Sequence, residues 1–194
     1  MRRLALGLLA ALLVGTMLPS PARSAPASGA RDPRTLALVD QHGKRFRIVD
    51  LAGHPVAITF VATRCTDACP IASAMFSRLQ ARLRRDGTKA TLLTVTLDPG
   101  FDSPFVMARY AREWDADART WRFVSGDPKA IGAMMRALGV VAVKGKDGIP
   151  DEHSSFVYVL DARGRLTRTF MLSTNSVEDV ARALRSPSVR TAKT

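Results

Sequence analysis

The sequence predicts an α/β fold in which helices flank a central mixed β-sheet. Two near-continuous apolar runs, at residues 54–63 and 90–98, have the length and composition of strands that are buried on both faces. Segments with the apolar spacing of helices alternate with such runs. Near the end of the chain, two strand-like runs enclose a turn at residues 162–164. Strands that alternate with helices and end in a hairpin indicate one α/β domain.

Turn and cap residues place the elements in the first half of this domain. Residues 35–49 form two extended runs around a Gln-His-Gly-Lys turn, which predicts a β-hairpin. The buried strand at 54–63 follows, and Cys69-Pro70 then opens a helix that ends at Asp86-Gly87. We expect one side of this helix to be buried. Its apolar residues are Ile71, Met75, Leu79 and Leu83.

The same signals organise the second half. Asp102-Ser103-Pro104 and Asp127-Pro128 each place a proline directly after a capping residue and therefore predict the start of a helix. Gly139 ends the second of these helices. The remaining elements are strands at 90–98, 121–126, 154–161 and 165–172 and a last helix at 176–184. This order predicts a thioredoxin-like fold with an added N-terminal β-hairpin.

The first 24 residues have the pattern of a bacterial secretory signal. Two arginines precede an apolar run at 4–18, and small residues follow it. The run is shorter than the roughly 20 residues of a membrane-spanning helix, so an uncleaved N-terminal anchor is the second interpretation. We therefore expect a periplasmic protein, anchored to the inner membrane if the signal is kept. Residues 25–33 read as a flexible tether, 34–186 as the folded domain and 187–194 as a basic tail.

The chain is strongly basic, with a formal net charge of +12. Residues 1–24 contain three arginines and no acidic residue, so their removal leaves +9. Such a charge suits an acidic protein partner or an acidic membrane surface, but arginines scattered along helix faces favour a simple solvated surface. Nucleic acid is excluded as a partner because the chain has no finger, helix-turn-helix or interleaved aromatic-basic pattern. A haem carrier is also excluded, since no Cys-x-x-Cys-His motif is present.

The only two cysteines, Cys65 and Cys69, lie in the segment FVATRCTDACP. A structural disulfide, a redox pair and a clamp for a soft metal are the three explanations. The segment joins the end of a strand to the start of a helix, where ligand sites of α/β sheets gather and where a helix N-terminus stabilises a thiolate. Arg64 adds a cation. We therefore expect both thiols to be partly exposed and reactive, which argues against a purely structural disulfide.

His153 is the candidate third member of this site. It precedes the strand at 154–161, and in a thioredoxin-like fold the loop before that strand packs beside the cysteine-bearing helix end. Two thiolates and an imidazole suit Cu(I), whereas a structural zinc site needs four ligands. His42 and His54 lie in a turn and a loop, and we expect both to be solvated. Adjacent Met134 and Met135 are interpreted as core residues.

Four segments together resemble the Sco/SenC family across almost the whole expected domain. The specific feature is the Cys-x-x-x-Cys-Pro motif with a distant histidine, and Thr66 stands where family members often have proline. The segments are Thr63–Pro70, Val95–Pro99 with Asp102–Pro104, Trp121–Gly126, and His153 ahead of Tyr158–Asp161 and Gly164.

The resemblance implies an exported metallochaperone that helps to assemble the CuA centre of cytochrome c oxidase. One copper, as Cu(I), Cu(II) or both, would be held by Cys65, Cys69 and His153. Asp98 would be a carboxylate just outside the ligands, although a simple turn residue before Pro99 is an equal interpretation. The partners would be the copper-bearing oxidase subunit and a copper donor protein. The alternative is a thiol-disulfide oxidoreductase in which Cys65 and Cys69 reduce the cysteines of the acceptor.

Overall fold

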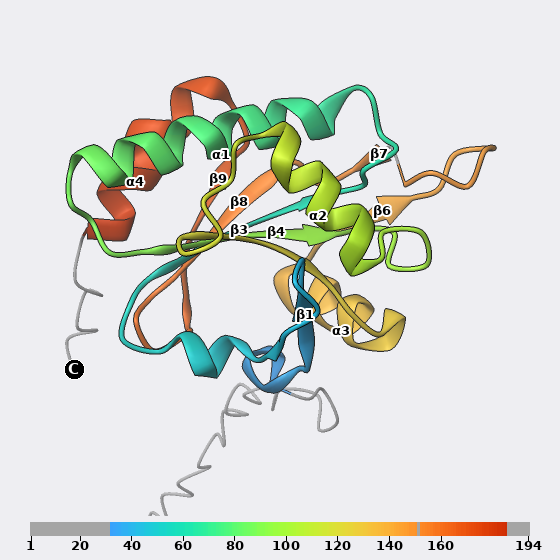
Figure 1. The fold of residues 1–194 in the computed structure, drawn as a ribbon, viewed down its shortest axis with the longest axis horizontal. Coiled ribbons are helices and arrows are strands. Elements are labelled where there is room, and N and C mark those ends of the chain that lie inside the picture. Colours follow the sequence, from blue (N-terminus) through green and yellow to red (C-terminus); the bar gives the residue numbers. More distant parts are fainter. Residues whose placement is uncertain (1–31, 151, 186–194) are drawn as a thin grey trace, which may run out of the picture.

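A computed structural model of the protein describes residues 32–150 and 152–185 (Figure 1). The predicted signal or anchor, most of the tether and the basic tail lie outside these residues. One mixed sheet of seven strands, in the order β2-β1-β5-β4-β3-β8-β9, forms the centre. Its strands are β1 (Leu38–Asp40), β2 (Arg45–Phe46), β3 (Val56–Val61), β4 (Thr91–Thr96), β5 (Trp121–Ser125), β8 (Phe156–Leu160) and β9 (Leu166–Met171).

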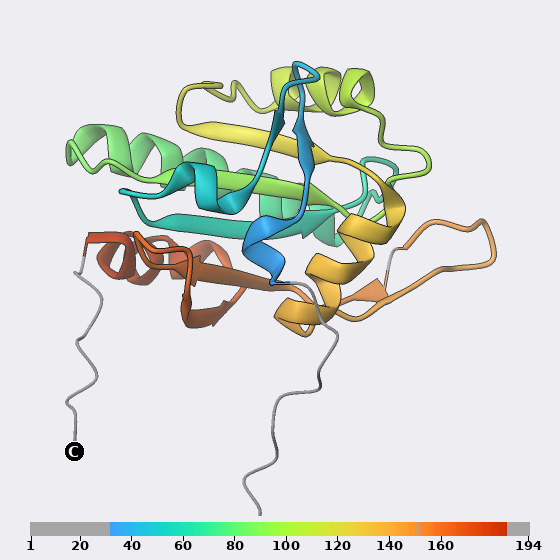
Figure 2. The ribbon, with the colours of Figure 1, turned by 90° about the horizontal axis from the view of Figure 1, so that it is seen from below.

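The three middle strands β3, β4 and β5 run parallel, and the others pair antiparallel. Every residue of β3 is buried, as its continuous apolar run predicts. Strands β1 and β2 pair through Leu38 with Phe46 and Val39 with Arg45. The predicted α/β fold is confirmed. The sheet contains both parallel and antiparallel pairs, and helices cover it on both faces (Figures 1 and 2).

Helices α1 and α4 lie side by side on one face of the sheet, and α3 lies on the other (Figures 1 and 2). Helix α2 packs against β5. The four helices are α1 (Ala68–Arg85), α2 (Pro104–Glu113), α3 (Pro128–Leu138) and α4 (Val177–Arg185). Helix α1 follows β3, so its first turn lies near the carboxyl end of that strand. Because β3 and β4 are parallel, β4 ends at the same edge of the sheet.

The predicted caps are present at both proline-started helices. The Ser103 hydroxyl accepts a hydrogen bond from the Val106 N–H at 3.4 Å at the start of α2. At the start of α3, Asp127 accepts from the N–H groups of Lys129 and Ala130. Gly139 closes α3 with φ of 69°, a left-handed conformation that glycine adopts without steric cost.

Three details differ from the sequence prediction. Ile71 is 47% exposed, because residues four apart turn by about 40° per step around a helix and the buried stripe of α1 passes beside it. The second run of the first hairpin ends in a short 3-10 helix, Ile48–Leu51. The predicted loop before the strand at 154–161 contains two short strands, β6 (Ala142–Val143) and β7 (Glu152–His153), which pair with each other.

Candidate metal centre

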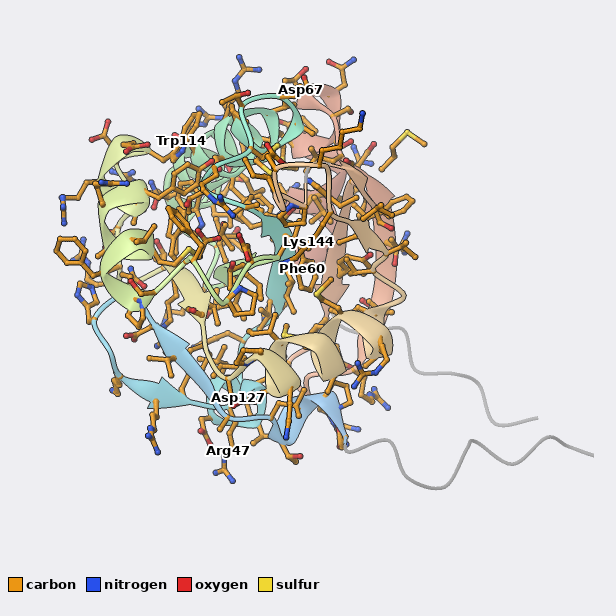
Figure 3. All side chains as sticks on the ribbon, turned by 90° about the vertical axis from the view of Figure 1, so that its right-hand side faces the viewer. Arg47, Phe60, Asp67, Trp114, Asp127 and Lys144 are labelled. Carbon is orange, nitrogen blue, oxygen red and sulfur yellow. The ribbon has the colours of Figure 1, made fainter. Side chains whose placement is uncertain are left out.

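The cysteine segment bridges the carboxyl end of β3 and the first turn of α1. Cys65 lies in the loop, and its N–H donates to the Ala62 carbonyl at 3.0 Å. Cys69 is the second residue of α1, and its Sγ accepts a hydrogen bond from the Ala62 N–H at 3.2 Å. Asp67 lies between the two at the N-cap of the helix, at the upper edge of Figure 3. Both thiols are free.

His153 comes to this segment from 84 positions away in the chain. Strand β7 places its Nε2 at 3.4 Å from the Cys69 Sγ, while its Nδ1 lies 3.3 Å from the Ser154 carbonyl oxygen. The two sulfurs and a ring nitrogen all lie within 4.8 Å of one another. The structure therefore brings together the three residues that the sequence analysis selected as ligands.

Burial of the thiols differs from the prediction of partly exposed cysteines. Cys65 is only 5% exposed and Cys69 is fully buried. Cys69 points inward because it shares the face of α1 that packs on the sheet. Burial raises the pKa of the Cys69 thiol well above its ordinary value, and the hydrogen bond from Ala62 offsets only part of this effect. The expectation of partly exposed thiols is therefore wrong, because the packing of α1 on the sheet covers them.

Asp98 lies two residues after the end of β4, beside this site but outside the group of three. Its Oδ2 accepts a hydrogen bond from Arg64 Nη2 at 2.7 Å, and its Oδ1 lies 3.7 Å from the Lys144 ammonium. The guanidinium of Arg64, the cation expected near the thiols, thus pairs with this carboxylate. The Arg64 guanidinium also stacks on the Phe101 ring, and its central carbon Cζ lies 4.4 Å from the ring centroid.

Asp102 is a buried carboxyl group that the sequence analysis assigned only to a helix cap. It accepts hydrogen bonds from the hydroxyls of Thr63, at 2.5 Å, and Thr96, at 2.6 Å. It also accepts from the Thr63 N–H at 3.3 Å. Asp102 therefore fixes the backbone two residues before Cys65. Asp102 follows a strand at the carboxyl edge of the sheet, and this position could have indicated a supporting role. The sequence analysis interpreted Asp102 only as part of the helix start at Ser103-Pro104.

The remaining candidates behave as expected. His42 and His54 are exposed, and Met134 is fully buried in the core. Within residues 32–150 and 152–185, no helix combines the length and the apolar character needed to cross a membrane.

The donor set limits what this site can hold. Thiolate sulfurs are soft ligands and an imidazole nitrogen also suits copper, and among the residues described in the structure no further histidine, cysteine or acidic residue joins the group. A closed four-ligand zinc site therefore does not fit, whereas a soft ion with two or three ligands does. The two sulfurs lie within 4.8 Å of each other, so a disulfide between them requires the sulfurs to move closer.

A family model described as SCO1/SenC matches residues 27–187. The chain belongs to the SCO1/SenC family. Its fold matches a SCO1/SenC family lipoprotein from Bacillus anthracis with a TM-score of 0.71 and 22% sequence identity, over 77% of this chain and 90% of that chain.

Two further solved Sco structures are similar. Bradyrhizobium japonicum ScoI with copper bound is 28% identical, with a TM-score of 0.66, over 77% of this chain and 96% of that chain. BsSco is described as a Sco-family cytochrome c oxidase assembly protein with a disulfide switch. It is 21% identical, with a TM-score of 0.70, over 81% of this chain and 92% of that chain.

Proposed function

We propose that this Sco/SenC protein is an exported copper metallochaperone. Cys65, Cys69 and His153 hold one copper ion and deliver it to the CuA centre in the copper-bearing subunit of cytochrome c oxidase. The observation that carries the proposal is the preassembled group of two thiols and one imidazole, all within 4.8 Å. Copper-bound ScoI, a family member, supports the choice of metal. The basic-apolar pattern of residues 1–24 supports export to the periplasm, with or without an inner-membrane anchor.

Each of the three residues has a separate task in this proposal. Cys69 forms the buried base of the site, where the protein excludes water from its sulfur. Cys65 lies in the loop, and His153 approaches from a separate two-strand unit. A site assembled from separate segments can lose one ligand without unfolding the domain, which suits an ion that must be handed on. The copper is cargo, so no catalytic turnover is required.

The alternative function is reduction of a disulfide at the acceptor's copper site. A thiolate from the pair would attack the acceptor disulfide to give a mixed disulfide. The second cysteine would then release the acceptor as two thiols and leave a Cys65–Cys69 disulfide. The free, closely spaced thiols and the disulfide switch described for BsSco favour this candidate. The buried Cys69 and the absence of a required role for His153 place it second.

The test measures copper content and thiol state on the same samples. Wild type, His153→Ala and the control His54→Ala, which removes an exposed histidine, are isolated from copper-supplemented cells. We expect about one copper per chain in wild type and His54→Ala, and loss of copper from His153→Ala when a chelator competes.

Two results would change the proposal. Full copper retention by His153→Ala would show that the histidine is not a ligand. No copper in any of the three proteins, with a disulfide that forms and is reduced equally well in all, would favour the reductase function.

A further inference from the structure

Asp98 occupies a fixed position between the two parts of the metal centre. It is only 5% exposed, and its own N–H donates to the Thr96 hydroxyl at 2.8 Å. Its carbonyl accepts from the N–H groups of Phe101, at 3.0 Å, and Asp102, at 2.8 Å. The carboxylate is therefore attached to the body of the sheet and cannot follow a moving loop. Its two oxygens face different segments.

One oxygen of Asp98 secures the cysteine side of the centre. Arg64, which precedes Cys65, donates to Oδ2 at 2.7 Å and stacks on Phe101. The Asp98 side chain is 7% exposed and that of Arg64 is 35% exposed, so water screens this ion pair only in part. Asp102 holds Thr63 from the same loop. The cysteine segment thus has several independent attachments.

The other oxygen faces the histidine side, which is attached through the short β6–β7 pair and through hydrogen bonds between Val141 and Ser154 at 2.9 and 3.1 Å. Lys144 follows β6 directly, and in the β6–β7 pair Ala142 is opposite His153. This pair has only two residue positions in register, and Val143 beside Lys144 is 53% exposed. The Lys144 ammonium lies 3.7 Å from Asp98 Oδ1. Figure 3, which looks onto this end of the molecule, labels Lys144 near the middle of the view.

We propose that Lys144 is a positioning residue whose ion pair with Asp98 holds the β6–β7 unit, and with it His153, against the cysteine segment. The inference rests on the proposed function in one respect, since it assigns to this contact a share of the control over copper release. The Lys144 side chain is 62% exposed, so the ion pair is weak and is screened by salt. It therefore opens often. The arrangement ties the movable ligand to the fixed ones by an electrostatic contact that can be released.

The first experiment uses the metal-free protein and compares Lys144→Met with Lys146→Met. Both variants remove one positive charge from the same connection, but no ion pair is found for Lys146 within the described part of the chain. We expect amide hydrogen exchange in residues 142–153 to be about two- to fivefold faster in Lys144→Met and unchanged in Lys146→Met. Raising the salt concentration should speed this exchange in wild type and have little effect in Lys144→Met.

Equal exchange in the two variants, or equal salt dependence in wild type and Lys144→Met, would overturn the inference. Asp98→Asn provides a further check, because it removes the carboxylate charge that Lys144 contacts. Adding Lys144→Met to Asp98→Asn should then produce little further increase in exchange. A full additional increase would show that Lys144 acts through another group.

The second experiment measures transfer of Cu(I) from the loaded protein to a chelator. We expect release to be about two- to fivefold faster from Lys144→Met than from wild type or Lys146→Met. If wild type takes up no copper, the proposed function fails while the exchange experiment still decides the role of Lys144. If wild type loads and Lys144→Met releases copper at the wild-type rate, the link to copper release is wrong and the chaperone function stands.

Discussion

Two carboxyl groups in the connection between β4 and α2 are in opposite electrostatic environments. Asp98 contacts two cations, Arg64 and Lys144. Asp102, four residues later, is fully buried and is hydrogen-bonded to threonine donors. Burial raises the pKa of Asp102, although the hydrogen bonds from Thr63 and Thr96 oppose the shift. One connection therefore supplies a charged group for the edge of the metal centre and a buried group for its support.

The raised pKa of Asp102 predicts how stability depends on pH. Because the folded protein binds this proton more tightly than the unfolded chain, the group favours folding at acid pH. That contribution is lost as pH rises from about 4 through the folded-state pKa. Asp102→Asn should be less stable than wild type, since one hydrogen bond to threonine is lost, but its free energy of unfolding should fall less over this range. Urea unfolding at several pH values measures the difference, and parallel profiles would contradict the assignment.

At the scale of elements, predictions succeeded where a local pattern determines the structure. The apolar runs predict β3 and β4 because both faces of these strands are covered, and Asp127 and Gly139 mark α3 because caps act within a few residues. The β6–β7 pair was missed because two residues per strand leave no periodic signal. Burial of Cys69 was missed because helix packing on the sheet, rather than the dipole of the helix, sets its environment.

For the metal centre, the three candidate ligands were selected from the sequence, whereas most of the groups around them were not. The Cys-x-x-x-Cys-Pro motif with a distant histidine selects three residues that the structure brings together. Asp98 was named only through the family resemblance, with a simple turn residue as an equal interpretation. The contacts of Lys144 and Asp102 depend on how loops from distant parts of the chain meet, and no spacing in the sequence records them.

The β8–β9 hairpin provides a prediction at this scale. Asp161 accepts from the N–H groups of Arg163, at 2.8 Å, and Arg165, at 3.0 Å, and from Arg165 Nε at 2.9 Å. Burial would raise the pKa of Asp161, but these hydrogen bonds and the charge of Arg165 lower it below its ordinary value of 3.8. Asp161→Asn should therefore reduce the free energy of unfolding by about 1–2 kcal/mol at neutral pH.

The sign of this effect with pH is opposite to that of Asp102. A carboxyl group with a lowered folded-state pKa stabilises the protein above about pH 4, and this stabilisation is lost as pH falls through the lowered pKa. The difference between wild type and Asp161→Asn should thus shrink under acid conditions. Asp127→Asn is a matched control, because asparagine also caps helices well, and it should change stability little. A cost that stays constant down to pH 2 would show that the carboxylate charge has no part in it.

At the scale of the whole molecule, sheet topology makes the metal centre. Parallel β3 and β4 end at the same edge, so the cysteine segment and Asp98 meet there. The chain then crosses to the other side of β3 before it enters β8, and the β6–β7 unit before that strand brings His153 back to the same edge. The centre therefore lies at one end of the molecule, at the first turn of α1.

The net charge predicts how that partner is found. Without residues 1–24 the chain carries +9, and a charge of this size accelerates encounter with an acidic partner. Exposed charges are screened over about 10 Å at 0.1 M salt. If the acceptor is an acidic domain of the oxidase, its association rate should fall about tenfold as salt rises from about 20 mM to about 500 mM, while dissociation changes much less. Stopped-flow measurement with the soluble copper-bearing domain tests this. An association rate that does not change with salt concentration would exclude electrostatic steering.

Charge reversals at two positions show whether the steering is local. Lys146 lies on the connection between β6 and β7, the unit that carries His153, whereas Lys89 precedes β4 and so lies at the opposite edge of the sheet. Lys146→Glu and Lys89→Glu change the net charge equally. A partner that docks at the metal centre should therefore associate more slowly with Lys146→Glu than with Lys89→Glu at low salt, because the reversed charge lies on the same end of the molecule as His153. Equal rates would mean that total charge, rather than the surface around Cys65 and His153, guides the encounter.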